Sequence, residues 1–183
     1  MPYDTAIEKS WQELEKLSGE TNFSVYFMND EYTVDTKARE ILSLSCNVRT
    51  KDYLTILLLH YLARSIKGLA KISEEWISFK LLPGGDGYYP TFKKRVIDKI
   101  LRKYGQHPEA LLELIERFNA KRTQIADISV VIEAFKGVPV LLTAWKGDDE
   151  FSPEINVHFD KSICDIFCTE DIVVMSEAIA GRI

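Results

Sequence analysis

ISVVIEAFKGVPVLLTAWKGDDEFSPEINVHFD, residues 128–160, contains three runs in which apolar side chains alternate with other residues. Alternation with a period of two is typical of a strand that buries one face. Lys136-Gly137 separates the first run from the second, and the glycine in Trp145-Lys-Gly-Asp-Asp-Glu-Phe151 separates the second from the third. Because glycine turns join neighbouring strands, the stretch predicts a three-strand antiparallel meander. Its inward side chains would be Ile128, Val130, Ile132, Val138, Val140, Leu142, Ala144, Ile155, Val157 and Phe159.

Helical spacing of apolar residues dominates much of the remaining chain. It predicts helices over residues 4–18, 50–68 and 91–104, another that begins near Pro108, and a last one after Thr169. The helix over residues 50–68 carries apolar side chains on more than one narrow stripe, so we expect it to be central to the core.

Three other segments complete the predicted architecture. Residues 23–34 predict a hairpin, residues 76–81 alternate as a strand, and residues 83–90 predict a turn-rich loop. The fold class is therefore α+β, in which an antiparallel sheet (the C-terminal three-strand meander plus the N-terminal hairpin) packs against about five helices. We expect residues 1–183 to form a single domain.

The composition is that of an ordinary soluble protein. The chain has 183 residues, of which 46% are hydrophobic and 28% are charged, so it can bury a substantial core. Its net charge of −5 argues against nucleic-acid binding, which usually needs a basic face. The longest apolar run is too short to span a bilayer, the N-terminus lacks an apolar signal core, and three cysteines suit a reducing compartment. We therefore expect a cytoplasmic protein that binds neither nucleic acid nor membrane.

Three consecutive carboxylates, Asp148, Asp149 and Glu150, lie between Trp145 and Phe151. They invite comparison with the G-G-D-E-F signature of diguanylate cyclases, but Asp148 stands where that signature has its second glycine, and too little chain follows. Carboxylate oxygens suit Mg²⁺ or Ca²⁺, yet adjacent side chains of an extended segment point to opposite sides. A solvated turn is the favoured interpretation, and a metal site stays open as the alternative.

Cysteine and histidine positions give no recognisable catalytic motif. Cys164 and Cys168 would share one face of a helix, but too few other ligands accompany them for a four-ligand metal site, so buried thiols are expected. His60 lies within an apolar helix, where a lone histidine is usually a core residue, although Arg64 could join it at a cleft. No phosphate-binding glycine motif is present. We expect no cofactor and no metal ligand set.

Charge is unevenly distributed along the chain. Residues 91–103 hold six basic side chains against one acid, and residues 145–171 hold eight acids against two lysines. Such a dipolar surface can orient a protein partner or support a head-to-tail homodimer. A solvated helix face opposite an acidic edge is the simpler interpretation.

Several segments together resemble one family, domain of unknown function 3786, which is found in anaerobic bacteria and archaea. The segments that carry the resemblance are residues 57–62, 76–85 and 88–89, Asp127, and residues 139–140, 145–151, 158–160 and 169–171. The chain departs from the family pattern at Lys80, where an arginine is favoured, and at Phe167-Cys168, where Leu-Pro is favoured. Some relatives resemble fusions with iron–sulfur modules or partners of corrinoid methyl-transfer systems, which implies an accessory role.

The aromatic residues near charge predict one binding cleft. Its lining would be His60, Trp76, Tyr88, Tyr89, Trp145, Asp148, Asp149, Glu150 and Phe151. We expect a binding or accessory protein for a protein partner or a small molecule, with homodimerisation left open. The alternative is a metal-dependent enzyme, in which the Asp148-Asp149-Glu150 turn supplies a metal ligand or general base and His60 supplies an acid.

Overall fold

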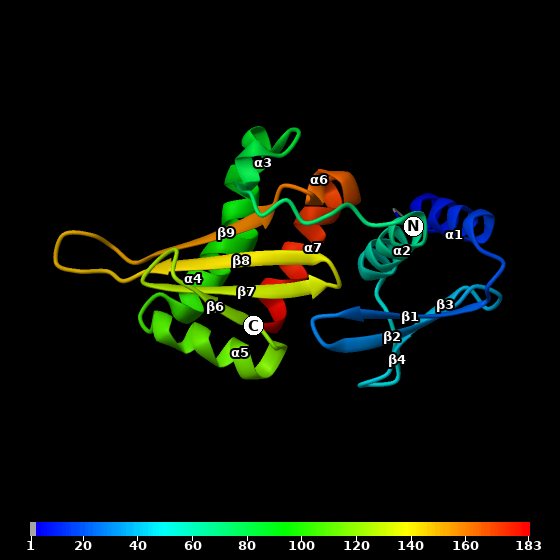
Figure 1. Cartoon of the computed structure of the whole chain (residues 1–183), viewed down its shortest axis with the longest axis horizontal. Helices are drawn as coiled ribbons and strands as arrows, with labels where there is room; N and C mark the ends of the chain where they lie inside the picture. Colours follow the sequence, from blue (N-terminus) through cyan, green and yellow to red (C-terminus); the bar gives the residue numbers. More distant parts are fainter. Residues whose placement is uncertain (1–2) are drawn as a thin grey trace.

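The computed structural model describes residues 3–183 and contains two antiparallel sheets (Figure 1). The first sheet has the order β1-β2-β3-β4 and is built from β1 (Asn22–Phe27), β2 (Asp30–Asp35), β3 (Glu40–Ser43) and β4 (Val48–Arg49). The second has the order β5-β9-β8-β7-β6 and is built from β5 (Trp76–Ser78), β6 (Lys121–Thr123), β7 (Ile128–Phe135), β8 (Val138–Trp145) and β9 (Glu154–Asp160). The predicted α+β class is confirmed, and the hairpin and the meander belong to separate sheets.

Much of the remaining chain is helical. The α-helices are α1 (Asp4–Leu17), α2 (Asp52–Lys67), α3 (Gly85–Phe92), α4 (Asp98–Tyr104), α5 (Glu113–Phe118), α6 (Ile163–Ile166) and α7 (Thr169–Arg182). Three further helical turns are η1 (Phe79–Leu81), η2 (Lys93–Ile97) and η3 (Pro108–Leu112), of which η2 is a π-helix. As predicted, α2 is central: six of its residues are buried, and it packs against both α1 and α7.

The N-terminal hairpin forms because alternate side chains of β1 and β2 enter the core. Val25 pairs with Tyr32 in the antiparallel register, and both are buried, as is Val34. The turn passes through Met28 and Asn29, which lie at φ 50° and 63°. Asparagine tolerates this left-handed region better than most residues, which explains the position of the turn.

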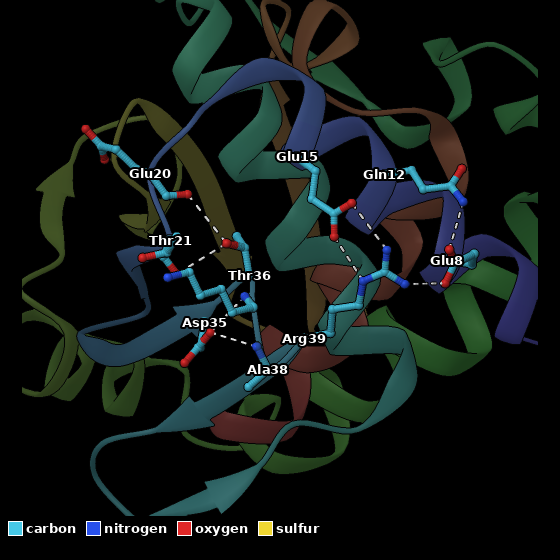
Figure 2. Close-up of polar contacts among 10 residues, drawn as sticks. Glu8, Gln12, Glu15, Glu20, Thr21, Asp35, Thr36, Ala38 and Arg39 are labelled. Carbon is cyan, nitrogen blue, oxygen red and sulfur yellow. Dashed lines mark hydrogen bonds and ion pairs between the residues drawn. The ribbon is translucent and has the colours of Figure 1, made fainter.

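Arg39 connects α1 to the first sheet (Figure 2). Its guanidinium donates to Glu15 through Nε (3.0 Å) and Nη2 (3.2 Å), and to Glu8 through Nη1 (2.7 Å). The turn that presents Arg39 is closed by Asp35 Oδ1, which accepts a hydrogen bond from the backbone N–H of Ala38 at 2.8 Å. Because these charged side chains are partly exposed, the network orients α1 more than it stabilises the fold.

The C-terminal meander is confirmed. Val130 lies opposite Leu142 where β7 pairs with β8, and Leu142 lies opposite Val157 where β8 pairs with β9. Gly137 adopts φ 78° in the β7–β8 turn, a conformation that glycine reaches without steric cost. Both η2 and α4 pack against β9. The helical segment from Lys93 to Tyr104 therefore lies against this sheet.

Residues 83–90, predicted as a loop, are mostly helical. Helix α3 begins at Gly85, and the chain continues through η2 and α4 as far as Tyr104. Pro90 lies inside α3, where proline lacks an N–H and crowds the preceding turn. The wider π-helical turn follows directly and is a recognised way to accommodate such a disruption. The strand predicted over residues 76–81 likewise ends at Ser78 and continues as η1.

Asp160 is a buried polar residue at the end of β9, only 1% exposed. Its carboxylate accepts hydrogen bonds from the backbone N–H and hydroxyl of Ser73, from the Glu74 N–H, and from the N–H and hydroxyl of Ser162. Burial alone would raise the pKa of Asp160, but these hydrogen bonds lower it to about 2. Asp160 therefore fastens the segment before β5 to the end of β9.

Candidate functional site

The connection between β8 and β9, residues 146–153, projects beyond the rest of the molecule, and we call it the acidic loop (Figure 1). Asp148 Oδ1 accepts hydrogen bonds from the backbone N–H groups of Phe151 (2.7 Å) and Glu150 (2.9 Å), and these lower the pKa of Asp148. A Cβ on Gly147 would lie 2.7 Å from a proline side chain across the turn. The turn therefore needs glycine, and the carboxylate of Asp148 is committed to shaping it.

Both ends of the acidic loop are fixed. Trp145 lies opposite Glu154 in the last register position of β8 and β9. The backbone N–H of Lys146 donates to Asp127 Oδ2 at 2.9 Å, from the connection between β6 and β7. The loop thus leaves the sheet in a defined direction.

A hollow of about 590 Å³ lies between the acidic loop and the chain around Glu109. Asp149 and Glu150 form no ion pair within residues 3–183. Phe151 is 69% exposed and Trp145 is 46% exposed. Exposed rings beside unpaired charge are typical of residues that anchor a protein interface.

His60 belongs to a second cluster, at the junction of α1, α2 and α7. Its Nδ1 lies 3.0 Å from each carboxylate oxygen of Asp171, and its Nε2 lies 3.1 Å from Ser10 Oγ. Ser10 and Asp171 are buried, whereas the His60 side chain is about one-third exposed. The three residues lie in the order of a Ser-His-Asp triad, but the serine is inaccessible to a substrate.

The hydrogen bonds define which protons His60 carries. Ser10 Oγ donates its single hydrogen to the carbonyl of Ala6 (2.8 Å), so it accepts from Nε2. An ionised carboxylate only accepts, so Nδ1 must also carry a hydrogen. The imidazolium form satisfies all of these contacts at once. In agreement, the hydrogen bond to Asp171 raises the pKa of His60, although burial opposes it.

Cys168 lies beside this cluster, in a hollow of about 220 Å³ that His60, Arg64 and Asp171 also line. Its thiol donates to Asp171 Oδ2 at 3.2 Å, and partial burial raises the pKa of the Cys168 thiol. All three cysteines are free and belong to the exposed residues, and the Cys168 thiol is only partly buried, which corrects the expectation of buried thiols. Cys164 and Cys168 do not share a helix face, because α6 ends before an extended Phe167.

No group of three or more His, Cys, Asp or Glu side chains within residues 3–183 is arranged to hold a metal ion.

The other predicted aromatics lie elsewhere. Tyr88 is exposed on α3 and accepts a hydrogen bond from Arg95 (3.1 Å). Tyr89 is half-buried, with Lys80 Nζ 4.3 Å from its ring centroid. Trp76 is half-buried on the edge strand β5, opposite Asp160. The Lys80 ammonium therefore makes a cation–π contact with the Tyr89 ring, a contact that a lysine or an arginine can make.

The predicted residues do not share a single cleft, and that part of the prediction is wrong. His60 lines one hollow, Tyr88 lines another of about 370 Å³, and Asp148, Asp149, Glu150 and Phe151 line a third. Helix α2 and the acidic loop lie in opposite halves of the molecule (Figure 1). The physical reason is that the meander carries its β8–β9 turn away from α2 and toward the chain around Glu109. His60 and the acidic turn, the two parts of the enzyme alternative, therefore do not meet.

The sequence prediction missed the partners of His60. Neither Ser10 nor Asp171 was among the predicted site residues, because each is an ordinary polar residue within a helix. The available signal was the resemblance: residues 57–62 and residues 169–171 both carry it, and each contributes one member of the His60–Asp171 pair. Thr169 and Pro83 also come from two segments that carry the resemblance, and they are in contact: the threonine hydroxyl donates to the proline carbonyl at 2.7 Å.

A family sequence model matches residues 12–182, nearly the whole chain. The chain belongs to the DUF3786 family, a domain of unknown function. This confirms the family resemblance of the individual segments. No curated protein and no solved structure shows a significant match to the chain. Within residues 3–183, no helix is both long enough and apolar enough to cross a membrane.

Proposed function

We propose that this protein is a binding or accessory module that recognises a partner protein through the acidic loop. One observation carries the proposal: Phe151, 69% exposed, lines a hollow of about 590 Å³ together with Asp149 and Glu150, which form no ion pair within residues 3–183. An exposed phenylalanine ring keeps apolar surface in contact with water, which is unfavourable in free energy. Burial of the ring in a partner would remove this cost.

The shape of the acidic loop supports recognition. Asp148 caps the turn with two hydrogen bonds, and Gly147 permits its close approach to the proline that follows. A loop that already holds its bound conformation loses less conformational entropy when a partner arrives. Its carboxylates favour a partner with a basic surface, and their long-range field would mainly raise the association rate.

The identity of the partner follows only from the resemblance, which implies proteins of anaerobic corrinoid or iron–sulfur metabolism. The three free cysteines suit a reducing compartment, so we place this interaction in the cytoplasm. A second copy of this chain is the other protein partner to test, because residues 91–103 hold six basic side chains.

Affinity capture from an anaerobic lysate tests the proposal when wild type is compared with matched variants. Phe151→Ser and the double variant Asp149→Asn/Glu150→Gln should each lose proteins that wild type retains. Leu81→Ser is the control, since Leu81 is an apolar residue of nearly equal exposure (70%) outside the loop. Equal recovery by wild type and Phe151→Ser would overturn the proposal. Self-association would instead appear in light scattering as a dimer that these variants and added salt dissociate.

The metal-dependent enzyme has less support, because the Asp148 carboxylate already caps its own turn and His60 lines a different hollow. Titration with Mg²⁺, Mn²⁺ and Zn²⁺ tests it directly. A rise in thermal midpoint that Asp149→Asn abolishes would revive this alternative.

A further inference from the structure

A hollow of about 410 Å³ lies on the helical side of the molecule, away from the acidic loop. It combines basic, aromatic and apolar side chains from four elements and the N-terminal segment. The lining residues are Tyr3, Tyr53, Arg95, Lys99, Val174, Glu177 and Ala178. A volume of this size is within the range of pockets that hold small molecules.

The π-helical turn η2 and the following helix α4 present the two basic side chains. Arg95 lies within η2, and Lys99 lies four residues later in α4. Residues four apart share a face of a continuous helix, and both line the hollow. Single π-helical turns are rare in proteins, and those that do occur are often found at functional sites.

The two cations differ in what they contact. Arg95 donates to Tyr88 Oη (3.1 Å) and Glu177 Oε2 (3.0 Å), so its guanidinium is held from two sides. Lys99 forms no hydrogen bond or ion pair within residues 3–183. Its Nζ lies 3.3 Å from the position that a Cβ on Gly181 would occupy. Glycine at position 181 therefore leaves room for the Lys99 ammonium group, which has no ion-pair partner within residues 3–183.

The remaining lining offers apolar contacts. Tyr3 and Tyr53 are 40% and 39% exposed, so their rings are accessible to a ligand. Val174 and Ala178 of α7 supply aliphatic surface between the charged groups. The two cations outnumber the single carboxylate, Glu177, so the hollow has a net positive charge.

We propose that this hollow binds a small organic anion that carries a planar group. Lys99, assisted by Arg95, would take the phosphate or carboxylate through charge-assisted hydrogen bonds. The planar group would lie against Tyr53 and Tyr3, as aromatic side chains commonly receive rings. This binding site is separate from the acidic loop, so it stands whether or not the partner proposal holds.

Calorimetric titration of the full chain, tagged only at the C-terminus, tests the site with phenyl phosphate, benzoate and inorganic phosphate. Phenyl phosphate should bind more tightly than inorganic phosphate, and benzoate shows whether a carboxylate suffices. Lys99→Gln should weaken phenyl phosphate binding about tenfold, the usual effect of losing one charge-assisted hydrogen bond. Tyr53→Leu should reduce the preference for phenyl phosphate over inorganic phosphate.

Lys103→Gln is the matched control, because it removes one positive charge from the same helix α4 at a residue outside the hollow. It should leave the affinity within about twofold of wild type, since exposed charges at a distance are screened by salt. Thermal midpoints of all variants confirm that they fold. The proposal is overturned if none of the three anions binds, or if Lys103→Gln weakens binding as much as Lys99→Gln.

Discussion

His60 and Asp171 are 111 residues apart in the sequence, yet the imidazole Nδ1 lies 3.0 Å from both carboxylate oxygens. The contact joins α2 to the first turn of α7, and Ser10 on the other side of the ring adds α1. Three helices from both ends of the chain are thereby tied to one imidazolium. Because the imidazolium loses its charge as the pH rises, the contribution of this cluster to stability depends on pH.

The His60–Asp171 pair should stabilise the fold below neutral pH. The folded pKa of His60 is raised above its ordinary value of 6.5, so the contribution is fully present below about pH 6.5 and is lost as the pH rises through the folded pKa. Asp171→Asn should lower the free energy of unfolding by about 1–2 kcal/mol at pH 6, a value reduced by solvent screening of the partly exposed ring. Urea unfolding of wild type and Asp171→Asn at pH 6 and at pH 9 measures the difference in free energy of unfolding at each pH.

A smaller effect of Asp171→Asn at pH 9 than at pH 6 supports the charged pair, and an equal effect at both would contradict it. His158, whose pKa burial lowers, cancels in this comparison because both proteins contain it. Glu170→Gln, an exposed acid in the same turn of α7, is the matched control and should leave stability nearly unchanged.

Asp160 should make the protein sensitive to acid. Its pKa is about 2 in the folded state against an ordinary value of 3.8. The stability is therefore present above about pH 4 and is lost as the pH falls toward 2; the shift corresponds to roughly 2–3 kcal/mol. Asp160→Asn should lose about this much at pH 7, and it should flatten the decline of stability between about pH 4 and pH 2. Asp165→Asn, at an exposed acid nearby, should reproduce the wild-type profile.

Gly85 and Gly87 should respond in opposite ways to alanine, although both lie in α3. A Cβ on Gly85 would lie 2.0 Å from the carbonyl oxygen of Phe79, whereas one on Gly87 would meet nothing within 4 Å. Gly85→Ala should cost about 1–3 kcal/mol or more because backbone must move, and Gly87→Ala should gain about 0.5–1 kcal/mol from helix propensity. Thermal unfolding measures both, and a stable Gly85→Ala variant would show that α3 starts elsewhere.

Asp148 should control the order of the acidic loop without affecting the rest of the fold. The backbone N–H groups of Glu150 and Phe151 both donate to its Oδ1. In Asp148→Ala, hydrogen exchange at these two amides should accelerate, while exchange in β8 and β9 should not change. Asp149→Ala, which removes an adjacent carboxylate, should leave both amides protected. Unchanged exchange in Asp148→Ala would mean that the carboxylate does not hold the turn.

Local sequence patterns predicted the elements that depend on local forces. Alternation from Ile128 to Phe159 predicted β7, β8 and β9, since a strand that buries one face needs this period. Helix α3 (Gly85–Phe92) was not predictable in this way, because Gly84, Gly85 and Pro90 are ordinary loop residues. It forms where Gly85 packs directly against the Phe79 carbonyl, a contact between segments that no local period records.

The sequence by itself determined the α+β class, the meander and the acidic character of the turn between Trp145 and Phe151, because each depends on residues close together in the chain. Only the tertiary structure decided which side chains share a site. It placed His60 beside Ser10 and Asp171, and it separated His60 from the acidic loop. Distances between residues far apart in the chain depend on how helices and sheets pack, and packing is decided by the whole core at once.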